Sequence, residues 1–199
     1  MRIRKRNRTR RALQRAAIDL VERKGYQATS VDEICEEVEV SRSTFFRYFG
    51  NKDSVFQSDL LEEEVIGLLD APVRLSLQAL EDRICAGFQE LSPEDWDAER
   101  RRMHLLQTVP ELRTSLFSEV FRPFPLAIHY VARMLDLPAD SLRVRTLAGA
   151  IIGALAAHQV PDADGMYELP ATAEDAIAIY RSTFRELNHI LDQNQVPMS

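Results

Sequence analysis

The stretch SRSTFFRYFGNK, residues 41–52, places four aromatic rings within five consecutive positions of a chain that is only 8% aromatic. Phe45 and Phe49 are four residues apart, so on a helix they lie on one face and can fill a core. Phe46 and Tyr48 lie to either side of that face. The outer surface carries hydrogen-bond donors: Arg42, Ser43, Thr44 and Arg47. This pattern predicts a short helix that is anchored by two rings and presents a polar, basic face.

The composition around this stretch is that of a globular protein. With 199 residues, 45% of them hydrophobic and 28% charged, the chain can form one ordinary domain or a small domain joined to a larger one. The longest apolar run, at 147–157, has 11 residues, whereas a membrane helix needs about 20. We therefore expect no membrane partner. No apolar signal segment follows the basic N-terminus, which favours a cytoplasmic protein. Cys35 and Cys85 lack CxxC spacing, which favours buried free thiols.

The net charge of −6 is unevenly distributed along the chain. Residues 1–60 carry 13 Lys/Arg and 9 Asp/Glu, a net charge of +4, whereas residues 61–199 carry 12 and 22, a net charge of −10. Residues 1–24 alone carry 10 cations and 2 anions. A basic head on an acidic body favours a polyanionic partner at the head. For residues 1–7, a solvated tail remains the alternative.

Glycine and proline are sparse, and between them apolar residues recur at the helical period, which predicts an all-α fold. Ser30 and Ser41 are expected to cap the second and third helices. Pro123 and Pro125 should break or bend a later helix near residues 121–124. Helices are expected over residues 8–24, 31–38, 42–48, 52–69, 74–91, 96–107, 111–135, 140–158 and 172–193.

The first three helices, with a tight turn before the third, predict a helix-turn-helix head. The major groove of DNA is about 12 Å wide and admits one such helix. There, arginine suits guanine edges, and hydroxyl groups suit phosphates or bases. We therefore expect a DNA-binding head over residues 1–51 and a ligand-binding and dimerisation body over residues 52–199. A purely structural three-helix cap is the alternative, but it leaves the outward arginines and hydroxyls without a role.

Residues 9–57 resemble the DNA-binding head of the TetR family of bacterial transcriptional regulators. The motifs are GYxxTSVxxI at 25–34, VSRSTFFRYF at 40–49 and NKD at 51–53. The resemblance implies phosphate contacts by Ser30 and Lys52, base contacts by Arg42, Ser43 and Thr44, and contacts along the sugar–phosphate strand by Phe46 and Tyr48. The outward Arg47 completes this predicted DNA-binding set.

Two residues depart from the family pattern. Phe46 stands where the family usually has tyrosine, so one phosphate hydrogen bond is lost and an apolar contact remains. Glu39 stands where the turn usually has glycine. A residue other than glycine in a left-handed turn costs roughly 1 kcal/mol, and the Glu39 carboxylate would lie near DNA. We expect both departures to affect specificity and affinity rather than the fold.

Two predicted helices of the body, 140–158 and 172–193, carry candidate dimer surfaces. In the first of them, small residues at intervals of four would let another helix approach closely. These residues are Gly149, Gly153 and Ala157. The second offers a matching apolar face that includes Tyr180, Phe184, Leu187 and Leu191. Two such helices from each subunit predict a four-helix interface in a homodimer, and packing within one chain is the alternative. A dimer would place two recognition helices one DNA turn apart, about 34 Å.

The segment 103–135 is a candidate wall for a ligand pocket. It holds an aromatic cluster flanked by two histidines, an arrangement that suits an apolar ligand with polar groups; a plain core is the alternative. The candidate residues are His104, Phe117, Phe121, Phe124 and His129. The segment looks like the body of a TetR-family subset that includes the mycofactocin-associated regulator, which implies a small apolar or acyl-type effector. The arginines at 100–102 could bind an anionic ligand head or form a solvated face.

The sequence holds no HExxH, CxxC, Walker or GxGxxG motif, and its four histidines are far apart. We therefore expect no enzyme, no cofactor and no metal site. The interpretation is a homodimeric regulator that binds a palindromic operator in double-stranded DNA and acts as a repressor released by a small-molecule effector. Two alternatives remain open: an architectural DNA-binding protein without ligand control, and a ligand-binding or scaffolding protein whose head no longer binds DNA.

Overall fold

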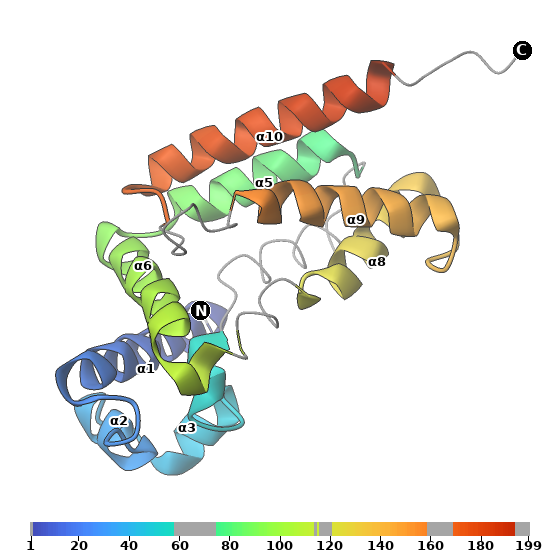
Figure 1. Ribbon diagram of the computed structural model, residues 1–199. Coiled ribbons are helices and arrows are strands. Elements are labelled where there is room, and N and C mark those ends of the chain that lie inside the picture. The colour runs from blue at the N-terminus through green and yellow to red at the C-terminus, as the bar shows by residue number, and fades with distance from the viewer. Residues whose placement is uncertain (1, 58–74, 114, 116–120, 159–168, 194–199) are drawn as a thin grey trace, which may run out of the picture. The chain divides into compact units, whose positions relative to one another are not determined.

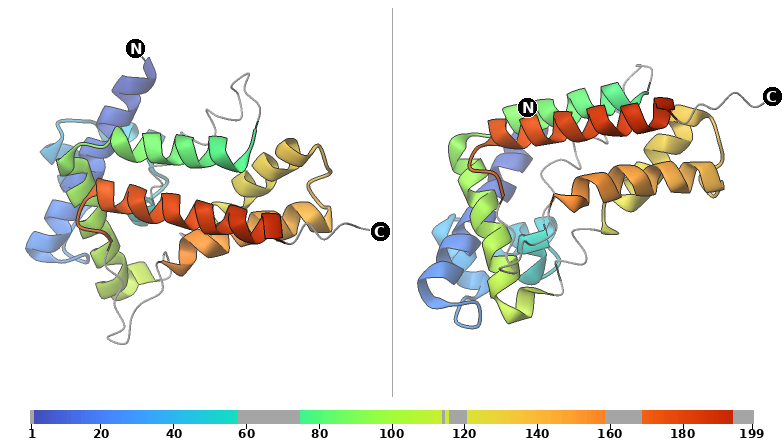
Figure 2. Two further views of the ribbon diagram at one scale, coloured as in Figure 1. Left: turned by 90° about the horizontal axis from the view of Figure 1, so that it is seen from above. Right: turned by 45° about the horizontal axis from the view of Figure 1, so that its top comes forward.

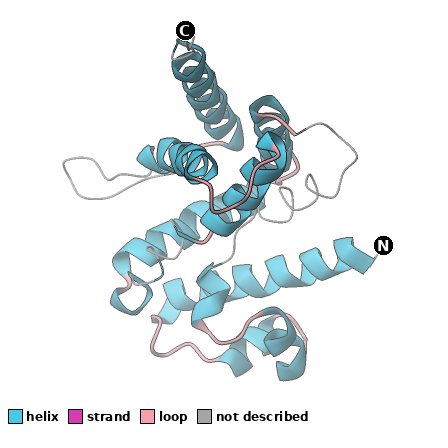
Figure 3. Ribbon diagram, turned by 90° about the vertical axis from the view of Figure 1, so that its right-hand side faces the viewer, coloured by secondary structure: helices cyan, strands magenta, loops and turns pink. Residues whose placement is uncertain are grey.

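The computed structural model describes residues 2–57, 75–113, 115, 121–158 and 169–193, and every regular element within these ranges is a helix (Figure 3). This confirms the predicted all-α fold. The α-helices, labelled in Figure 1, are α1 Arg2–Lys24, α2 Val31–Glu37, α3 Arg42–Tyr48, α5 Leu77–Gln89, α6 Pro93–Thr108, α8 Phe124–Leu135, α9 Leu142–Ala157 and α10 Ala173–Gln193. Two short 3-10 helices are η1 Asp53–Gln57 and η2 Pro110–Leu112.

The described residues form two compact units, and each is considered by itself. The first contains α1, α2, α3, η1, α6 and η2, and the second contains α5, α8, α9 and α10. The sequence predicts a boundary between residues 51 and 52, with all later residues in the body. In the structure, α6 belongs to the compact unit of the N-terminal helices.

The core of the first unit lies between α1 and the short helices that follow it. Leu13 of α1, Ile34 of α2 and Phe45 of α3 are fully buried. The rings of Phe45 and Phe49 have centroids 5.5 Å apart, and Phe49 is also buried. Both rings therefore anchor α3 from behind, as the sequence predicted.

The ends of the short helices are set by local chemistry. Ser30 and Glu33 form a reciprocal capping box at the start of α2, and the Ser41 hydroxyl caps α3. Gly25 ends α1 with a φ of 88°, and Glu39 occupies the turn between α2 and α3 with a φ of 55°. Glu39 therefore adopts the left-handed conformation that glycine adopts without strain.

The second unit is built on apolar packing between antiparallel helices. Figures 1 and 2 show α5 and α10 lying side by side along their length. Ile84 and Phe88 of α5 are buried, as is Phe184 of α10. The rings of Phe88 and Tyr180 meet edge to face, with centroids 5.0 Å apart. Helices α8 and α9 pack against each other in the same unit, with Tyr130 fully buried.

Two predicted helices differ from the observed ones. The helix expected over 111–135 is interrupted, and α8 begins at Phe124 directly after Pro123, so the predicted proline break is confirmed. The helix expected over 52–69 begins as the 3-10 helix η1, and residues 58–69 lie outside the described ranges.

Both cysteines are buried and free of disulfides, as predicted. Burial raises the pKa of the Cys35 thiol and of the Cys85 thiol, so both favour the protonated form.

Candidate nucleic-acid interface

Helix α3 has two contrasting faces. Its inner face is closed by Phe45, which is fully buried, whereas Phe46 exposes 47% of its surface. Arg42, Ser43 and Arg47 are exposed on the outer side. Thr44 and Tyr48 are partly buried at the margins. The predicted base-reading residues therefore lie on a solvent-facing surface.

Three hydroxyl groups gather at the N-terminus of α3. The Ser41 oxygen accepts a hydrogen bond from the Thr44 backbone N–H at 3.2 Å. It also lies 2.9 Å from the Ser43 hydroxyl and 3.0 Å from the Thr44 hydroxyl. Because hydroxyl groups both donate and accept and can rotate, this cluster can exchange its internal bonds for bonds to a nucleic acid.

Aromatic rings hold the other outward side chains. The Arg47 guanidinium lies 5.3 Å from the centroid of the Tyr48 ring, a distance typical of a cation–π contact. Phe46 meets Phe45 edge to face, with ring centroids 5.3 Å apart. The exposed ring of Phe46 is therefore supported by the buried one.

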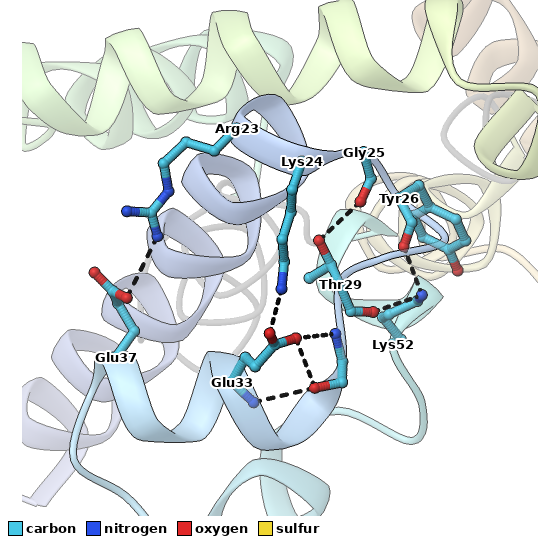
Figure 4. A network of polar contacts seen from close by, with 9 residues as sticks. Arg23, Lys24, Gly25, Tyr26, Thr29, Glu33, Glu37 and Lys52 are labelled. Atoms are coloured by element: carbon cyan, nitrogen blue, oxygen red, sulfur yellow. Dashed lines mark hydrogen bonds and ion pairs between the residues drawn. The ribbon is translucent and has the colours of Figure 1, made fainter.

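Lys52 is held by backbone carbonyls, as Figure 4 shows. Its ammonium donates to the carbonyl oxygens of Tyr26 and Thr29, each at 2.9 Å. The same nitrogen lies 3.9 Å from the centroid of the Tyr26 ring. Because an ammonium has three N–H donors, two are already engaged in tying down the turn after α1. The predicted phosphate contact of Lys52 stays a prediction, and the lysine also has this structural role.

Tyr26 extends the same network. Its phenol donates a hydrogen bond to the Asp53 carboxylate at the start of η1. Burial, followed by this hydrogen bond and the Asp53 charge, raises the pKa of the Tyr26 phenol above its ordinary value. Tyr26, Lys52 and Asp53 together join the turn after α1 to the segment that follows α3.

Ser30 is occupied by helix capping. Its hydroxyl donates to the Glu33 carboxylate at 2.8 Å and accepts from the Glu33 backbone N–H at 3.3 Å. Lys24 also pairs with Glu33 (Figure 4). The bond from Lys24, followed by the bonds from Ser30, lowers the pKa of the Glu33 carboxyl to about 2. A phosphate contact by Ser30, as the resemblance implied, would have to share this hydroxyl with the cap.

Arg42 is paired with a carboxylate of the neighbouring helix. Its Nε lies 3.1 Å from Oδ1 of Asp32, and its Nη1 donates to Oδ2 at 3.5 Å. Arg23 pairs with Glu37 at 3.4 Å (Figure 4). Three acidic residues of α2 therefore pair with cations of the head. Sequence reasoning missed these pairs. The opposite charges of Asp32 and Arg42, each in the first turn of its helix, are the one signal that the sequence offers for them.

Behind this surface, two buried polar side chains hold η1. Gln14 of α1 donates to the Val55 carbonyl at 3.0 Å, and Arg102 of α6 donates to the Phe56 carbonyl at 2.5 Å. Arg102 is 2% exposed and also pairs with Glu99. Sequence reasoning offered the arginines at 100–102 as ligand or solvent contacts and missed this role.

The neighbouring Arg101 joins α6 to α1. Its guanidinium donates to the Asp19 carboxylate at 2.5 Å and also pairs with Glu22. These bonds raise the pKa of the Arg101 guanidinium above its ordinary value, with the bond to Glu22 as the largest cause. The solvated face that the sequence allowed for this arginine is therefore a network of ion pairs.

The candidate ligand residues are only partly brought together. Phe121 and Phe124 stack with centroids 6.0 Å apart in the second unit, with Phe121 exposed. His104 is exposed on α6 in the first unit, and His129 is exposed on α8 in the second. Phe117 lies outside the described residues. The ligand-binding role of all five stays a prediction.

The candidate dimer residues divide into open and covered ones. A Cβ built on Gly149 or Gly153 would meet nothing within 4 Å, and Ala157 is exposed. In contrast, Phe184 and Leu187 are 1% and 8% exposed within the protomer. Both lie on α10, whose main neighbour is α5 of the same chain, so their apolar burial needs no second subunit.

Two other candidates on α10 lie between these extremes. Tyr180 is partly buried against Phe88 of α5. Leu191, near the C-terminal end of the helix, exposes 38% of its surface. The dimer-interface role of the whole set stays a prediction.

The comparisons with known proteins decide the family. Residues 13–58 match the family model of bacterial regulatory proteins of the tetR family, and residues 75–184, more than half of the chain, match the model of the MftR C-terminal domain. The chain belongs to the TetR family. It is therefore a transcriptional regulator of the DNA-binding type, and its relatives are regulators rather than enzymes.

Two relatives of known name cover different parts of this TetR-family chain. The transcriptional regulator TcmR of Streptomyces glaucescens is 47% identical over 55 residues, which are 28% of this chain and 24% of TcmR. MftR of Mycobacterium tuberculosis, assigned as a mycofactocin biosynthesis transcriptional regulator, is 25% identical over 160 residues, 78% of this chain and 81% of MftR. The chain therefore spans about a quarter of TcmR and about four fifths of MftR.

Solved structures support the fold. TylP, a TetR regulator from Streptomyces fradiae, has a TM-score of 0.52 at 20% identity, over 91% of this chain and 85% of TylP. A protein of Mesorhizobium loti assigned to the same family has a TM-score of 0.50 at 16% identity, over 93% and 97% of the two chains. Within the described residues, no helix is long and apolar enough to cross a membrane, and no group of side chains has the composition of a metal site.

Proposed function

We propose that this TetR-family chain is a homodimeric, sequence-specific repressor that binds a palindromic operator in the cytoplasm and releases it when a small apolar or acyl-type ligand binds. The observation that carries the proposal is the two-faced α3. Its ring Phe45 is fully buried, while Arg42, Ser43 and Arg47 face solvent. A short helix fixed from behind and polar in front suits insertion into a major groove.

The proposed division of labour on α3 follows from side-chain chemistry. Arg42 supplies the donors for a guanine edge, and the Ser43 and Thr44 hydroxyls reach neighbouring bases or phosphates. Phe46 and Tyr48 lie along the sugar–phosphate strand, where the exposed ring of Phe46 supplies an apolar contact, such as one to a thymine methyl. Arg47 completes the DNA-binding set on the outward face. Ser30 and Lys52 add phosphate contacts at the edges of the surface.

Dimerisation is proposed to use the open surfaces of the second unit. The space beside Gly149 and Gly153 allows close approach of another helix. Leu142 of α9 is 82% exposed, and Ile190 and Leu191 of α10 are 53% and 38% exposed. A second copy that covered these residues would remove apolar surface from water. It would also supply the second recognition helix that a palindrome requires.

Ligand control is proposed to act through the second unit. The match of residues 75–184 to the MftR C-terminal domain supports a body of the same type, and the stacked Phe121 and Phe124 offer an apolar contact for a ligand. A ligand that favoured a conformation with poor operator affinity by about 1–3 kcal/mol would weaken DNA binding roughly 5- to 150-fold.

Selection of bound duplexes from random DNA tests the proposal. The full chain should enrich a palindrome, and repeating the selection with candidate acyl-type ligands should reduce recovery of that palindrome. Arg47→Ala should weaken operator binding, whereas Arg133→Ala, a charge-matched change on α8, should not. Binding that falls steeply with salt but shows no sequence preference would favour an architectural protein. No DNA binding at all would favour a scaffolding protein.

A further inference from the structure

On the outward surface of the head, a carboxylate forms an ion pair with Arg42, the first residue of α3. Asp32 lies in the first turn of α2, and its two oxygens lie 3.1 Å and 3.5 Å from Nε and Nη1 of Arg42. Both side chains remain open to solvent, at 65% exposure for Arg42 and 55% for Asp32. The pair therefore lies where a DNA duplex would approach, rather than inside the protein.

Folding stability does not explain this pair. Ion pairs between exposed side chains contribute little to stability. A carboxylate in the first turn of α2 interacts favourably with the helix dipole whether or not Arg42 is present. The position of the pair on the outward surface calls for a role in binding instead.

The segment that surrounds this ion pair has a net negative charge. Residues 25–57, which span α2, the turn and α3, carry three Lys/Arg and six Asp/Glu, a net charge of −3. The basic charge of the chain lies in residues 1–24, with its 10 cations and 2 anions. Because carboxylates repel phosphates, the segment around α3 has little general attraction for DNA. Its binding must depend on directed contacts.

The donor geometry of Arg42 suits one such contact. A guanidinium has five N–H donors in a planar fork. Asp32 takes one from Nε and one from Nη1, which leaves one N–H on Nη1 and two on Nη2. An arginine presents such a pair of neighbouring nitrogens to O6 and N7 of guanine. Because the side chain is already held, less rotamer freedom is lost when it binds.

We propose that Asp32 is a positioning residue that sets the sequence specificity of α3. It holds Arg42 in the orientation that reads a guanine edge. It also cancels part of the arginine's attraction for phosphates, so that binding to non-operator DNA is weakened. This inference rests on the proposed insertion of α3 into the major groove.

The test compares the full-length protein with its Asp32→Asn variant in selections from one random duplex library. The position read by Arg42 is identified as the one whose guanine enrichment disappears in Arg42→Ala. At that position, Asp32→Asn should lower guanine enrichment about fivefold, the low end of the discrimination supplied by one bidentate arginine–guanine contact. Its affinity for a fixed duplex of scrambled sequence should rise, with a steeper dependence on salt.

Glu36→Gln is the matched control. It removes one negative charge from the same helix, one turn further along, and the described residues hold no cation paired with the Glu36 carboxylate. This variant should raise affinity for the scrambled duplex but leave guanine enrichment unchanged. A double variant, Asp32→Asn with Arg42→Ala, should show the enrichment profile of Arg42→Ala alone, since Asp32 acts through that arginine.

Each outcome separates the inference from its rivals. If the wild type enriches a palindrome and Asp32→Asn gives the same profile, Asp32 does not position Arg42 and the inference is wrong. A parallel loss of affinity for every duplex, together with a lower melting temperature, would assign Asp32 a structural role and also overturn it. If the wild type enriches no sequence, the proposed function itself fails, and with it the premise of the inference.

Discussion

The two compact units of this protein both have apolar cores, but the structure also shows ion pairs between the helices of the first. In the first, polar side chains tie helices to one another: Arg11 and Arg15 of α1 pair with Asp95 of α6, and Arg102 bonds the Phe56 carbonyl. In the second, α5 and α10 bury apolar faces, as at Phe184. In the first unit, which contains α3, ion pairs between helices therefore add to the apolar core.

This difference has a consequence for how each unit responds to its surroundings. Ion pairs near a surface weaken with salt and acid, whereas apolar burial has no charge to titrate or to screen. Hydrogen bonds and ion pairs also have defined directions, so they fix the orientation of the helices behind α3 more narrowly than apolar contacts do. A surface that reads base edges requires that kind of definition.

The largest expected effect is in the apolar unit. Phe184→Ala removes a ring that is 1% exposed and should lower the free energy of unfolding by about 3–5 kcal/mol, from lost transfer energy and the cavity that remains. Ile190→Ala, at a side chain 53% exposed on the same helix, is the control and should have little effect on the monomer. Hydrogen exchange should show the Phe184 loss in α5 and α10. An equal loss in both variants would contradict the packing described here.

The next largest effect is expected at Arg102, a buried polar side chain of the first unit. Arg102→Met leaves the Glu99 carboxylate without its partner and the Phe56 carbonyl without its donor. We expect a loss of about 2–3 kcal/mol, below the range for fully buried pairs because Glu99 is reached by some water. Trp96, the chain's single tryptophan, is buried in this unit, so its fluorescence follows the transition.

A double variant separates charge from packing at this site. Arg102→Met with Glu99→Leu removes both charges and should recover part of the lost stability, because no carboxylate is then left unpaired. If the double variant were less stable than the wild type by the sum of the losses measured for Arg102→Met alone and Glu99→Leu alone, the pair would not be coupled. The Trp96 signal measures both.

The third prediction compares one backbone feature across the two units. Glu39 and Asp136 have φ values of 55° and 53°, one in the turn before α3 and one at the end of α8. Glu39→Gly should raise the free energy of unfolding by up to about 1 kcal/mol, measured by thermal denaturation. Asp136→Gly should gain less, because aspartate tolerates the left-handed region better than glutamate does. Equal gains would show that side-chain chemistry has no part in the strain.

The head was predictable in detail because its signals are local. Ser30 and Ser41 predict the starts of α2 and α3, and the spacing of Phe45 and Phe49 predicts the inner face of α3. In the structure both serines cap their helices and both rings are buried. The left-handed turn at Glu39 was also accessible, through the family pattern. These inferences needed only neighbours within a few residues.

The long-range features were not predictable in the same way. Arg102 and Phe56 are 46 residues apart, and Arg101 and Asp19 are 82 apart, so no periodic pattern connects them. Phe184 fits an apolar face that could meet another subunit or another helix of its own chain, and the sequence left both open. In the structure Phe184 is 1% exposed on α10, whose main neighbour is α5 of the same chain. Side chains that pair across elements require the arrangement of the helices to be known first.

The smallest effect concerns a single exposed carboxyl. Glu33 has a pKa lowered to about 2 in the folded protein, chiefly by the bond from Lys24, against about 4.3 for an unperturbed glutamate. A lowered folded-state pKa means that the ionised form is favoured by folding. Its contribution is therefore complete above the unfolded pKa, and declines as pH falls from about 4.3 toward 2. NMR titration of the Glu33 carboxyl should find its midpoint near pH 2.

Two variants divide the causes of this shift. Lys24→Met should move the Glu33 midpoint furthest toward the unperturbed value, because the Lys24 bond is the largest cause, and Ser30→Ala should move it less. High salt should reduce the share due to the Lys24 charge, since the Debye length falls to about 3 Å at 1 M, while leaving the loss caused by Phe184→Ala unchanged. If 1 M salt changed the stability loss of Phe184→Ala but left the Glu33 midpoint unmoved, the contrast between the ion pairs of the first unit and the apolar packing of the second would be wrong.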